Sequence, residues 1–504
     1  MYDVIIIGCG IVGAATAYEL SKYNLTIAVL EKENDIAVAT TKANSAIIHA
    51  GYDPKPGTLM ARLNVEGAVI AKDLFEILDV PYKQCGALVL AFSQEEVLVL
   101  ENLLQNGKQN GVQGLGMLDK SQVINLEPGL NKDVEAALHV PTTMIVSPWE
   151  YGLALAETAV KNGVELQREC EVIDIKKAHN GYRIQTGQGE IHTRYVINAA
   201  GLYADKINNM VAGKGIEADD ADSARLKFEV QSDRGEYFLL DKSEGTLVNH
   251  VIFQCPSNFG KGVLVAPTVH GNLIIGPNSI EIDDCDDTSN TAAGLDIVKK
   301  AAHKSVPAID FRANIRNFAG NRAKIAKPGQ RDFIIAEAIN AKGFVNLAGI
   351  SSPGLSAAPA IAKMAVEILK DSGIELIEKK NFNEERKRIR FNELSPKSKA
   401  ELVAHNPAYG TVVCRCETVT EGEIFDALQS PIPPISVDGV KRRCGAGMGR
   451  CQGGFCGPRV VEILAAHYKC SPMEILQDRA GTHIFTSETR HSQEKHKGGG
   501  CCGG

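Results

Sequence analysis

Apolar and polar positions near the N-terminus follow the order strand, helix, strand. Residues 3–8 form an apolar run that predicts a buried strand, and a glycine-rich turn follows it. A helix is expected from that turn to about Tyr23, and residues 25–31 predict a second strand. A β-α-β unit of about 30 residues is typical of a parallel sheet. The chain therefore begins with a predicted α/β domain.

The pattern then alternates between helices and strands before it becomes rich in strands. Strand-like runs occur at 87–92, 164–175, 194–199 and 343–348. Helical patterns occur at 95–105, 150–163 and 356–371. Residues 225–285 hold several apolar runs separated by glycine and proline, which predicts an antiparallel sheet. We expect this sheet to belong to a second, substrate-binding domain.

The C-terminal part of the chain changes character. Residues 378–400 are rich in Lys, Arg, Glu and Asn, and we interpret this charge run as a solvated helix or linker. A compact cysteine-bearing module is expected at 410–480. The remaining residues, 481–504, are polar and glycine-rich and are predicted to be disordered.

Composition narrows the class of protein. With 504 residues, more than one domain is expected. The net charge of −7 argues against nucleic acid as the main partner, because phosphate binding needs a basic surface. Neither a transmembrane run of about 18 apolar residues nor a signal peptide is apparent. We therefore expect a cytoplasmic protein without direct membrane insertion, which would reach a membrane only through a partner.

The first turn carries a dinucleotide fingerprint, Gly8-Cys9-Gly10-Ile11-Val12-Gly13. It follows a strand, opens a helix and is followed by an acidic residue, Glu31, at the end of the second strand. Gly8 permits the tight turn, Gly10 the approach to a pyrophosphate, and Gly13 the packing of helix on strand. Glu31 would accept hydrogen bonds from a ribose and repel a 2′-phosphate, which disfavours NADP.

Three features favour FAD over NAD. The fingerprint is close to the N-terminus, and a later strand ends in Asn198-Ala199-Ala200-Gly201 with Asp205 beyond it. A third glycine turn, Gly349 to Leu355, opens a helix whose N-terminus can face the flavin pyrimidine edge. The alternative interpretation of Asn198 to Gly201 is an ordinary exit from a strand into a loop. The alternative interpretation of Gly349 to Leu355 is an ordinary start of a helix. The expected FAD contacts beyond the fingerprint and Glu31 are Asn44, Ser45, Val172, Ala200, Gly201, Gly349, Gly354 and Leu355.

Residues 1–370 resemble the D-amino-acid-oxidase-type flavoproteins, in particular the glycerol-3-phosphate dehydrogenase and L-2-hydroxyglutarate oxidase branches. The resemblance is carried by the fingerprint, the Gly349–Leu355 turn, and the stretches 44–51, 234–237 and 271–278. It implies FAD, oxidation of a C–H bond next to OH or NH, and transfer of hydride to flavin N5.

Eight of the 13 cysteines follow residue 410, and four of them have close spacing. Cys414 and Cys416 form C-x-C, and Cys451 and Cys456 form C-x4-C. Four thiolates suit an iron–sulfur cluster or zinc, and C-x-C is too tight for the usual zinc spacing. The third interpretation is that these four cysteines are inert thiols, which bind neither a cluster nor zinc. Cys444 is a spare thiol or a substitute ligand.

The tail cysteines Cys501 and Cys502 either bind metal with His491 and His496 or have no role.

The module resembles the bacterioferritin-associated-ferredoxin-like 2Fe–2S domain, which ends the catalytic subunit of the anaerobic glycerol-3-phosphate dehydrogenase. Gly447-Met448-Gly449 before Cys451-Gln452-Gly453 carries that resemblance. It implies a second flavoprotein or Fe–S subunit as electron-transfer partner. A cluster beside a flavin also suits a dehydrogenase that passes electrons on, since the flavin takes two electrons and the cluster passes one at a time.

The same resemblance implies which residues bind a small anionic substrate and act on it. His49, in the His-x-Gly stretch, is the expected base or flavin contact; the alternative is an interior histidine. Arg322 matches an arginine that holds the substrate anion in relatives, and a guanidinium fork suits phosphate or carboxylate. Arg234 and Lys261 are secondary candidates, whose alternative is a solvated charge on a loop.

The substrate expected from the whole chain is glycerol 3-phosphate, oxidised to dihydroxyacetone phosphate. Ser352-Pro353-Gly354 departs from the Gly-Gly-Lys of the glycerol-3-phosphate dehydrogenases and favours L-2-hydroxyglutarate or another 2-hydroxy or amino acid. Two non-enzymatic readings also stay open: an electron-transfer subunit whose flavin meets no substrate, and a zinc-bound docking module.

The expected fold is therefore α/β, with a Rossmann-like FAD-binding domain, an inserted antiparallel-sheet substrate domain and a small α-rich Fe–S domain. The flavoprotein part is expected at 1–370, followed by a linker at 371–409. Its FAD-binding parts are about 1–80, 150–215 and 325–370, and its substrate parts about 81–149 and 216–324.

Overall fold

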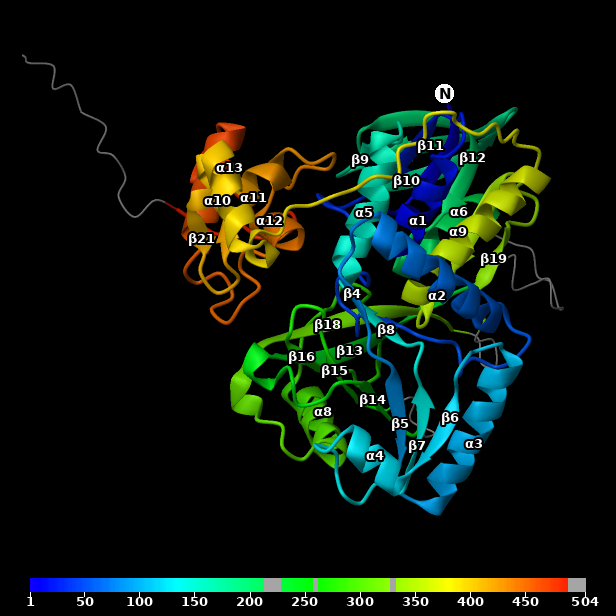
Figure 1. Cartoon of the computed structure of the whole chain (residues 1–504). Coiled ribbons are helices and arrows are strands. Elements are labelled where there is room, and N and C mark those ends of the chain that lie inside the picture. Colours follow the sequence, from blue (N-terminus) through cyan, green and yellow to red (C-terminus); the bar gives the residue numbers. More distant parts are fainter. Residues whose placement is uncertain (213–227, 257–261, 327–331, 488–504) are drawn as a thin grey trace, which may run out of the picture.

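The computed structural model describes residues 1–212, 228–256, 262–326 and 332–487. Two large sheets lie one beyond the other, and a small helical module is beside them (Figure 1). The fold is mixed α/β with a small C-terminal domain, as predicted. Among the described residues, no helix is long and apolar enough to cross a membrane.

The first sheet contains the predicted β-α-β unit. Strand β1 pairs in parallel with β2 and β12, and β12 pairs in parallel with β20. The sheet order is β10-β11-β12-β1-β2-β9, with β20 and β19 added beside β12. Its strands are β1 (Tyr2–Ile7), β2 (Ile27–Leu30), β9 (Glu165–Gln167), β10 (Val172–Ala178), β11 (Gly181–Thr186), β12 (Gly189–Asn198), β19 (Ile334–Glu337) and β20 (Phe344–Ala348).

Helices cover this sheet with their apolar sides. Helices α1, α2, α5 and α9 share one buried core with residues of β1, β2 and β20. The bounds are α1 (Ile11–Leu20), α2 (Leu59–Ile77), α5 (Pro148–Lys161), α6 (Ala204–Ala212) and α9 (Gly354–Asp371). The close contact of α1 with β1 depends on Gly13, where a Cβ would come within 2.0 Å of the Gly8 carbonyl oxygen.

The second sheet has nine strands in the order β17-β13-β16-β15-β14-β5-β7-β6, with β18 beside β13. Its pairing is antiparallel except for β5 and β14, which run parallel. Its strands are β5 (Ala87–Ala91), β6 (Gly116–Asp119), β7 (Ala136–Val140), β13 (Val230–Leu240), β14 (Val251–Gln254), β15 (Leu264–Pro267), β16 (Leu273–Gly276), β17 (Ile280–Ile282) and β18 (Asn314–Ile325). Helices α3 (Gln94–Gln109), α4 (Lys120–Leu126) and α8 (Ala292–Ser305) belong to this part.

A third, three-stranded sheet joins the two parts. It has the order β3-β8-β4 and consists of β3 (Ile47–Ile48), β4 (Tyr82–Gln84) and β8 (Met144–Val146). His49 directly follows β3, so this small sheet positions it between the two large ones.

The single strand predicted at 164–175 is wrong. The segment forms β9 and β10, which are at opposite edges of the first sheet. Between them Glu169 has a left-handed backbone, with φ of 54°, and its N–H donates to the Glu33 carbonyl at 3.0 Å. The Cys170 N–H donates to the Glu31 carbonyl at 2.9 Å. These two bonds turn the chain, and the apolar pattern gives no sign of them.

The C-terminal module contains two short strands and several helices. They are β21 (Val412–Cys414), β22 (Val419–Thr420), α10 (Pro396–His405), α11 (Glu421–Leu428), α12 (Val437–Cys444) and α13 (Gly457–Tyr468). Thr420 and Glu423 form both bonds of a capping box at the start of α11. Most of the tail, including the last two cysteines, lies outside the described residues.

The charge run at 378–400 is not solvated throughout, contrary to the prediction. Arg386, Arg388 and Arg390 form ion pairs with acidic residues of the first domain. Their side chains are 10%, 19% and 15% exposed, so this segment is held against the domain rather than free in solvent. The patterning of charges could not reveal their partners, which are more than 200 residues away in the chain.

Candidate functional site

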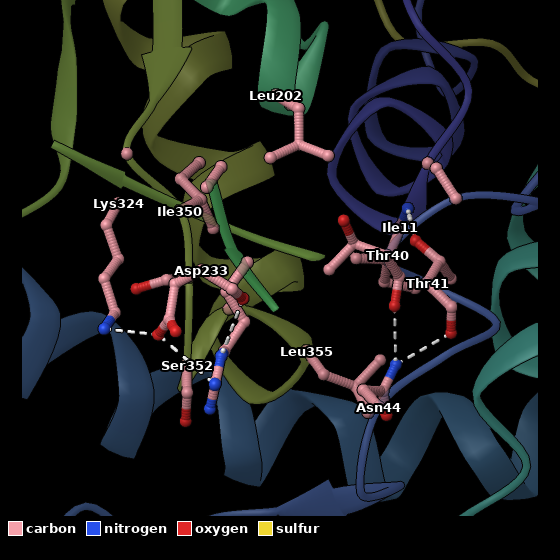
Figure 2. A pocket seen from close by; sticks show the side chains of 18 of the residues that line it. Ile11, Thr40, Thr41, Asn44, Leu202, Asp233, Lys324, Ile350, Ser352 and Leu355 are labelled. Atoms are coloured by element: carbon pink, nitrogen blue, oxygen red, sulfur yellow. Dashed lines mark hydrogen bonds and ion pairs between the residues drawn. The ribbon is translucent and has the colours of Figure 1, made fainter. Parts of the chain in front are cut away.

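A cavity of about 2120 Å³ lies between the first and second sheets. Residues from the β1–α1 turn, the segment 31–45, the end of β12, strands β13 and β18 and the β20–α9 turn line it. Figure 2 shows two of its ends, with Asn44 near Ile11 on one side and Asp233 with Lys324 on the other. The cavity thus connects the glycine fingerprint with the second sheet.

The fingerprint glycines occupy the places that a dinucleotide needs. Gly8 and Gly10 line the cavity, and Gly8 has a φ of 94°. A Cβ on Gly8 would lie 2.7 Å from the Ala199 carbonyl oxygen, so a side chain is excluded there. Gly13 is behind the turn, against Gly8. The first N–H groups of α1 have no partner within the helix, and the glycines before it carry no side chain that would block a ligand. This arrangement is suited to a pyrophosphate.

Glu31 ends β2 at the cavity wall. Its carboxylate accepts the Cys9 N–H at 2.8 Å and the Glu33 N–H at 3.0 Å. Burial raises the pKa of Glu31. Each carboxylate oxygen has a further lone pair, so the group can still accept a ribose hydroxyl.

The other predicted FAD contacts also line the cavity: Asn44, Ser45, Val172, Ala200, Gly201, Gly349, Gly354 and Leu355. Asn44 uses its amide to hold the local turn, donating to the Thr40 and Thr41 carbonyls at 3.1 and 2.8 Å. The Ser45 hydroxyl lies 3.3 Å from that of Tyr237. Together with the glycine turn, this lining fits FAD.

At the far end of the cavity, Asp233 holds two cations. The carboxylate is fully buried, at 3.2 Å from Arg322 and in an ion pair with Lys324. The Ser279 hydroxyl donates to both of its oxygens, at 2.8 and 3.0 Å. Two cations facing one carboxylate leave a net positive charge at the cavity wall, which suits an anion.

Lys324 was not among the residues predicted for the substrate. The sequence signal that could have identified it is the two-residue period of a strand. Lys324 is two residues after Arg322 on β18, so the two side chains point to the same face. Arg322 also donates to the Asn278 carbonyl at 2.9 Å, which fixes the plane of its guanidinium. His49 lines the cavity too. Its backbone N–H donates to the Ser356 hydroxyl at 2.7 Å, and the centroid of its imidazole ring is 5.8 Å from that of the Phe253 ring.

Arg234, a predicted substrate contact, points to the other face of β13. It is 5% exposed and forms an ion pair with Asp287, and its guanidinium donates to the Ser289 hydroxyl at 3.0 Å. Successive side chains of a strand alternate in direction, so Asp233 and Arg234 cannot both face the cavity. The structure gives Arg234 a structural role instead. Lys261 lies outside the described residues.

The four predicted cluster ligands come together in two pairs. Cys416 and Cys451 are exposed and their sulfurs are 3.5 Å apart. Cys414 and Cys456 are buried, and a hydrogen bond from Cys456 lowers the pKa of Cys414 to about 6. Within the described residues, no three His, Cys, Asp or Glu side chains are arranged closely enough to hold a metal ion.

Glycines shape the loop that carries the second cysteine pair. Gly447 and Gly453 have φ of 91° and 87°, and a Cβ on Gly449 would lie 2.4 Å from that of Cys416. The loop can therefore approach Cys416 closely, as a shared cluster requires. Cys444 is buried elsewhere, its thiol donating to the Val440 carbonyl at 3.3 Å. Burial raises the pKa of Cys444 to about 12. Both features favour the spare-thiol reading.

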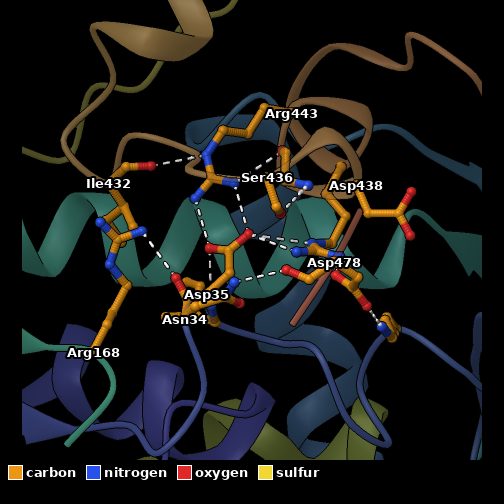
Figure 3. Close-up of polar contacts among 12 residues, drawn as sticks. Asn34, Asp35, Arg168, Ile432, Ser436, Asp438, Arg443 and Asp478 are labelled. Atoms are coloured by element: carbon orange, nitrogen blue, oxygen red, sulfur yellow. Dashed lines mark hydrogen bonds and ion pairs between the residues drawn. The ribbon is translucent and has the colours of Figure 1, made fainter. Parts of the chain in front are cut away.

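The module is attached to the first domain by a buried ionic clamp, formed by Asp35, Arg442 and Arg443. Figure 3 shows Asp35 beneath Arg443 and beside Asp478. Asp35 accepts from Arg442 at 2.8 Å and from Arg443 at 2.8 and 2.9 Å. All three residues are at most 5% exposed. Asp478 extends the clamp, at 2.8 Å from Arg442 and 2.6 Å from Lys42. Asp35 lies between Glu33 and Ala37, which line the cavity, so the module is bound directly beside the cavity wall.

Replacing Asp35 by asparagine is expected to lower the free energy of unfolding by about 3 kcal/mol, because the buried Arg443 guanidinium loses its counter-charge and Arg442 keeps only that of Asp478. Burial alone would raise the pKa of Asp35, but Arg443 and Arg442 hold it well below its usual value. The stabilisation is therefore complete above the ordinary carboxyl pKa of about 4 and is lost as the pH falls further. Urea denaturation at several pH values measures both effects.

Asp310→Asn is the matched control, since Asp310 pairs with the exposed Arg312 at 2.7 Å. It should change stability little. Equal destabilisation by the two variants at neutral pH would contradict the assigned role of the clamp.

Comparisons with known proteins agree with this geometry. Residues 3–368 match the FAD dependent oxidoreductase family and residues 412–466 the BFD-like [2Fe-2S] binding domain. A glycerol 3-phosphate dehydrogenase of Caloramator mitchellensis is 49% identical over 97% of this chain and 99% of its own length. A glycerol 3-phosphate oxidase of Mycoplasma genitalium is 34% identical over 76% of this chain and 97% of its own.

Among solved structures, the dithionite-reduced L-alpha-glycerophosphate oxidase of Mycoplasma pneumoniae with FAD bound superposes with a TM-score of 0.69. It is 33% identical and covers 76% of this chain and 98% of its own. The chain therefore belongs to the FAD-dependent oxidoreductase family, among the relatives of the glycerol 3-phosphate dehydrogenases and oxidases, and it carries a BFD-like 2Fe–2S domain.

Proposed function

We propose that this protein oxidises sn-glycerol 3-phosphate to dihydroxyacetone phosphate and passes the electrons through its 2Fe–2S domain to a partner. The observation that carries the proposal is the cationic end of the cavity, where Arg322 and Lys324 share the single carboxylate of Asp233. The same chain binds FAD at the other end. A relative that matches 97% of this chain, across both domains, is a glycerol 3-phosphate dehydrogenase.

FAD, when bound, supplies the acceptor for the hydride that leaves the substrate carbon. The residues of the chain do the rest of the work. Arg322 and Lys324 bind the phosphate, and a dianion is held better by two cations than by one. The His49 imidazole accepts the hydroxyl proton, so that the C2 oxygen becomes a carbonyl as the hydride departs.

For the flavin itself, we propose the lining residues predicted from the sequence. Gly8 and Gly10 with the start of α1 hold the pyrophosphate, and Glu31 holds the ribose. Gly349, Gly354 and Leu355 surround the flavin, because the N-terminus of α9 faces the cavity there. Asn44, Ser45, Val172, Ala200 and Gly201 complete the wall, and Gly13 supports it from behind.

A 2-hydroxy acid such as L-2-hydroxyglutarate remains the alternative, and Ser352 is the residue that favours it. Ser352 lines the cavity, so the departure from Gly-Gly-Lys changes the site itself. Lys324 beside Arg322 weighs against a monocarboxylate substrate, because a single carboxylate needs only the fork of Arg322.

For the electron acceptor, we propose a second flavoprotein or Fe–S subunit that docks at the cluster end of the module. Phe455, beside Cys456, is 54% exposed and lies under the Arg415 guanidinium at 4.3 Å from its ring centroid. An exposed aromatic residue next to a redox group is suited to a protein contact. We propose that the enzyme acts in the cytoplasm and meets a membrane only through this partner.

The test is reduction of the bound flavin by substrate in the absence of oxygen. Glycerol 3-phosphate is expected to bleach the flavin band at about 450 nm within the time of a turnover, while L-2-hydroxyglutarate and amino acids leave it unchanged. Bleaching by a hydroxy or amino acid alone would overturn the proposed substrate. No bleaching by any of them would instead support the electron-transfer subunit.

A further inference from the structure

The clamp fixes which side of the module faces the second sheet. The cluster loops, defined as residues 414–417 and 447–456, contact the substrate domain at two places. Lys242 pairs with Glu417 at 2.8 Å, and the Arg316 guanidinium donates to the Gln452 side chain at 3.2 Å. Glu417 and Gln452 directly follow the exposed cysteines Cys416 and Cys451. The exposed cysteine pair therefore lies beside residues that contact β18 and the turn directly after β13.

These two strands also reach the cavity. Tyr237 of β13 lines it, and directly opposite on β18 is Phe318. Their rings are stacked, with centroids 4.7 Å apart and planes inclined by 7°. Tyr237 is 4% exposed, so the pair forms a packed aromatic bridge in the wall of the cavity.

Beyond Phe318, the same face of β18 leads to the cluster loops. Arg316 is two residues before Phe318 on β18 and points to the same face. Its bond to Gln452 reaches the residue next to Cys451. Tyr237 and Phe318 in the cavity wall thus share one face of the sheet with Arg316, whose side chain bonds to the residue beside Cys451.

We propose that Tyr237 and Phe318 form the route by which electrons leave the flavin for the cluster. Phe318 is a positioning residue, since it acts through Tyr237 and Arg316. With both cofactors bound, each transfer would move one electron from the reduced flavin to the oxidised cluster, where one Fe³⁺ would become Fe²⁺. The inference rests on the proposed function, because it takes both cofactors to be bound.

The test is the rate of that single step in a Phe318→Leu variant that holds both cofactors. The bound flavin is reduced by a laser flash with an external photoreductant, and cluster reduction is followed by its visible absorbance. Leucine leaves a gap where two rings were packed, and we expect transfer to slow by about fivefold or more. Because no substrate is added, a wrong substrate assignment does not affect the result.

Phe311→Leu is the matched control. Phe311 packs on the neighbouring residue of β13, Phe238, with ring centroids 4.8 Å apart, and it has the same change of size. Residues 237 and 238 point to opposite faces, so only Phe318 is on the proposed route. Transfer in Phe311→Leu should match the wild type. Equal rates in the two variants would overturn the proposal.

Two further measurements separate the route from a merely structural role. Redox titration should give unchanged potentials for both cofactors in Phe318→Leu, which excludes an altered driving force. Hydrogen exchange of the cluster loops should also match the wild type, which shows that the module stays docked. Slower transfer together with faster exchange in these loops would mean that Phe318 only supports docking, and would overturn the route.

Discussion

Replacing Arg322 by leucine is expected to lower kcat/KM for glycerol 3-phosphate by about 10²- to 10³-fold, mainly through a higher KM. The guanidinium is fixed by Asp233 and by the Asn278 carbonyl, so the unliganded enzyme already holds it in place. Its loss removes the fork that binds the phosphate, while Lys324 remains to neutralise Asp233. The variant should therefore fold, and steady-state kinetics with a one-electron acceptor measures the effect.

Arg312→Leu serves as the control for this substitution, because its side chain is 92% exposed just before β18. It should leave both kinetic constants unchanged. Arg322→Lys should recover only part of the loss, since an ammonium cannot form two parallel bonds. An unchanged KM in Arg322→Leu would remove this residue from the substrate site.

Replacing Cys451 by serine is expected to abolish the 2Fe–2S cluster. Cys451 and Cys416 form the exposed pair, and a hydroxyl is a far poorer ligand for iron than a thiolate. Iron, acid-labile sulfide and the visible bands of the cluster should be lost together. Reduction of the flavin by glycerol 3-phosphate should persist, because the cavity lies in the other domains.

Cys444→Ser is the control in the same module. Its side chain is 5% exposed and donates to the Val440 carbonyl, a bond that serine can keep. The cluster should remain. Loss of iron in Cys444→Ser with retention in Cys451→Ser would make Cys444 the substitute ligand. Zinc in place of iron in the wild type would support the docking module instead.

Local patterns were enough for the parts of the fold that depend on neighbours in the chain. The first β-α-β unit and its glycine turn follow from residues 3–31 alone, because backbone conformation and helix packing there depend on Gly8 and Gly13. The prediction of a fused 2Fe–2S domain likewise needed only a short stretch of cysteines and glycines, and the family comparison agrees with it.

Where partners are remote, the same patterns were misleading. Residues 164–175 read as one strand, but the backbone of Glu169 turns the chain between two edges of the sheet. Arg234 looked as suitable for an anion as Arg322, yet strand alternation and Asp287 turn it away. Lys324 became visible only once it shared Asp233 with Arg322.

The sequence alone was sufficient to predict the nucleotide turn, the cysteine-bearing module and the order of the domains, since each depends on short stretches of consecutive residues. The tertiary structure was needed for the anion site and for the place of the module. Asp35 and Arg443 are 408 residues apart, and Tyr237 and Phe318 belong to strands joined by a long excursion of the chain. Such contacts depend on how whole domains pack, and no local periodicity contains that information.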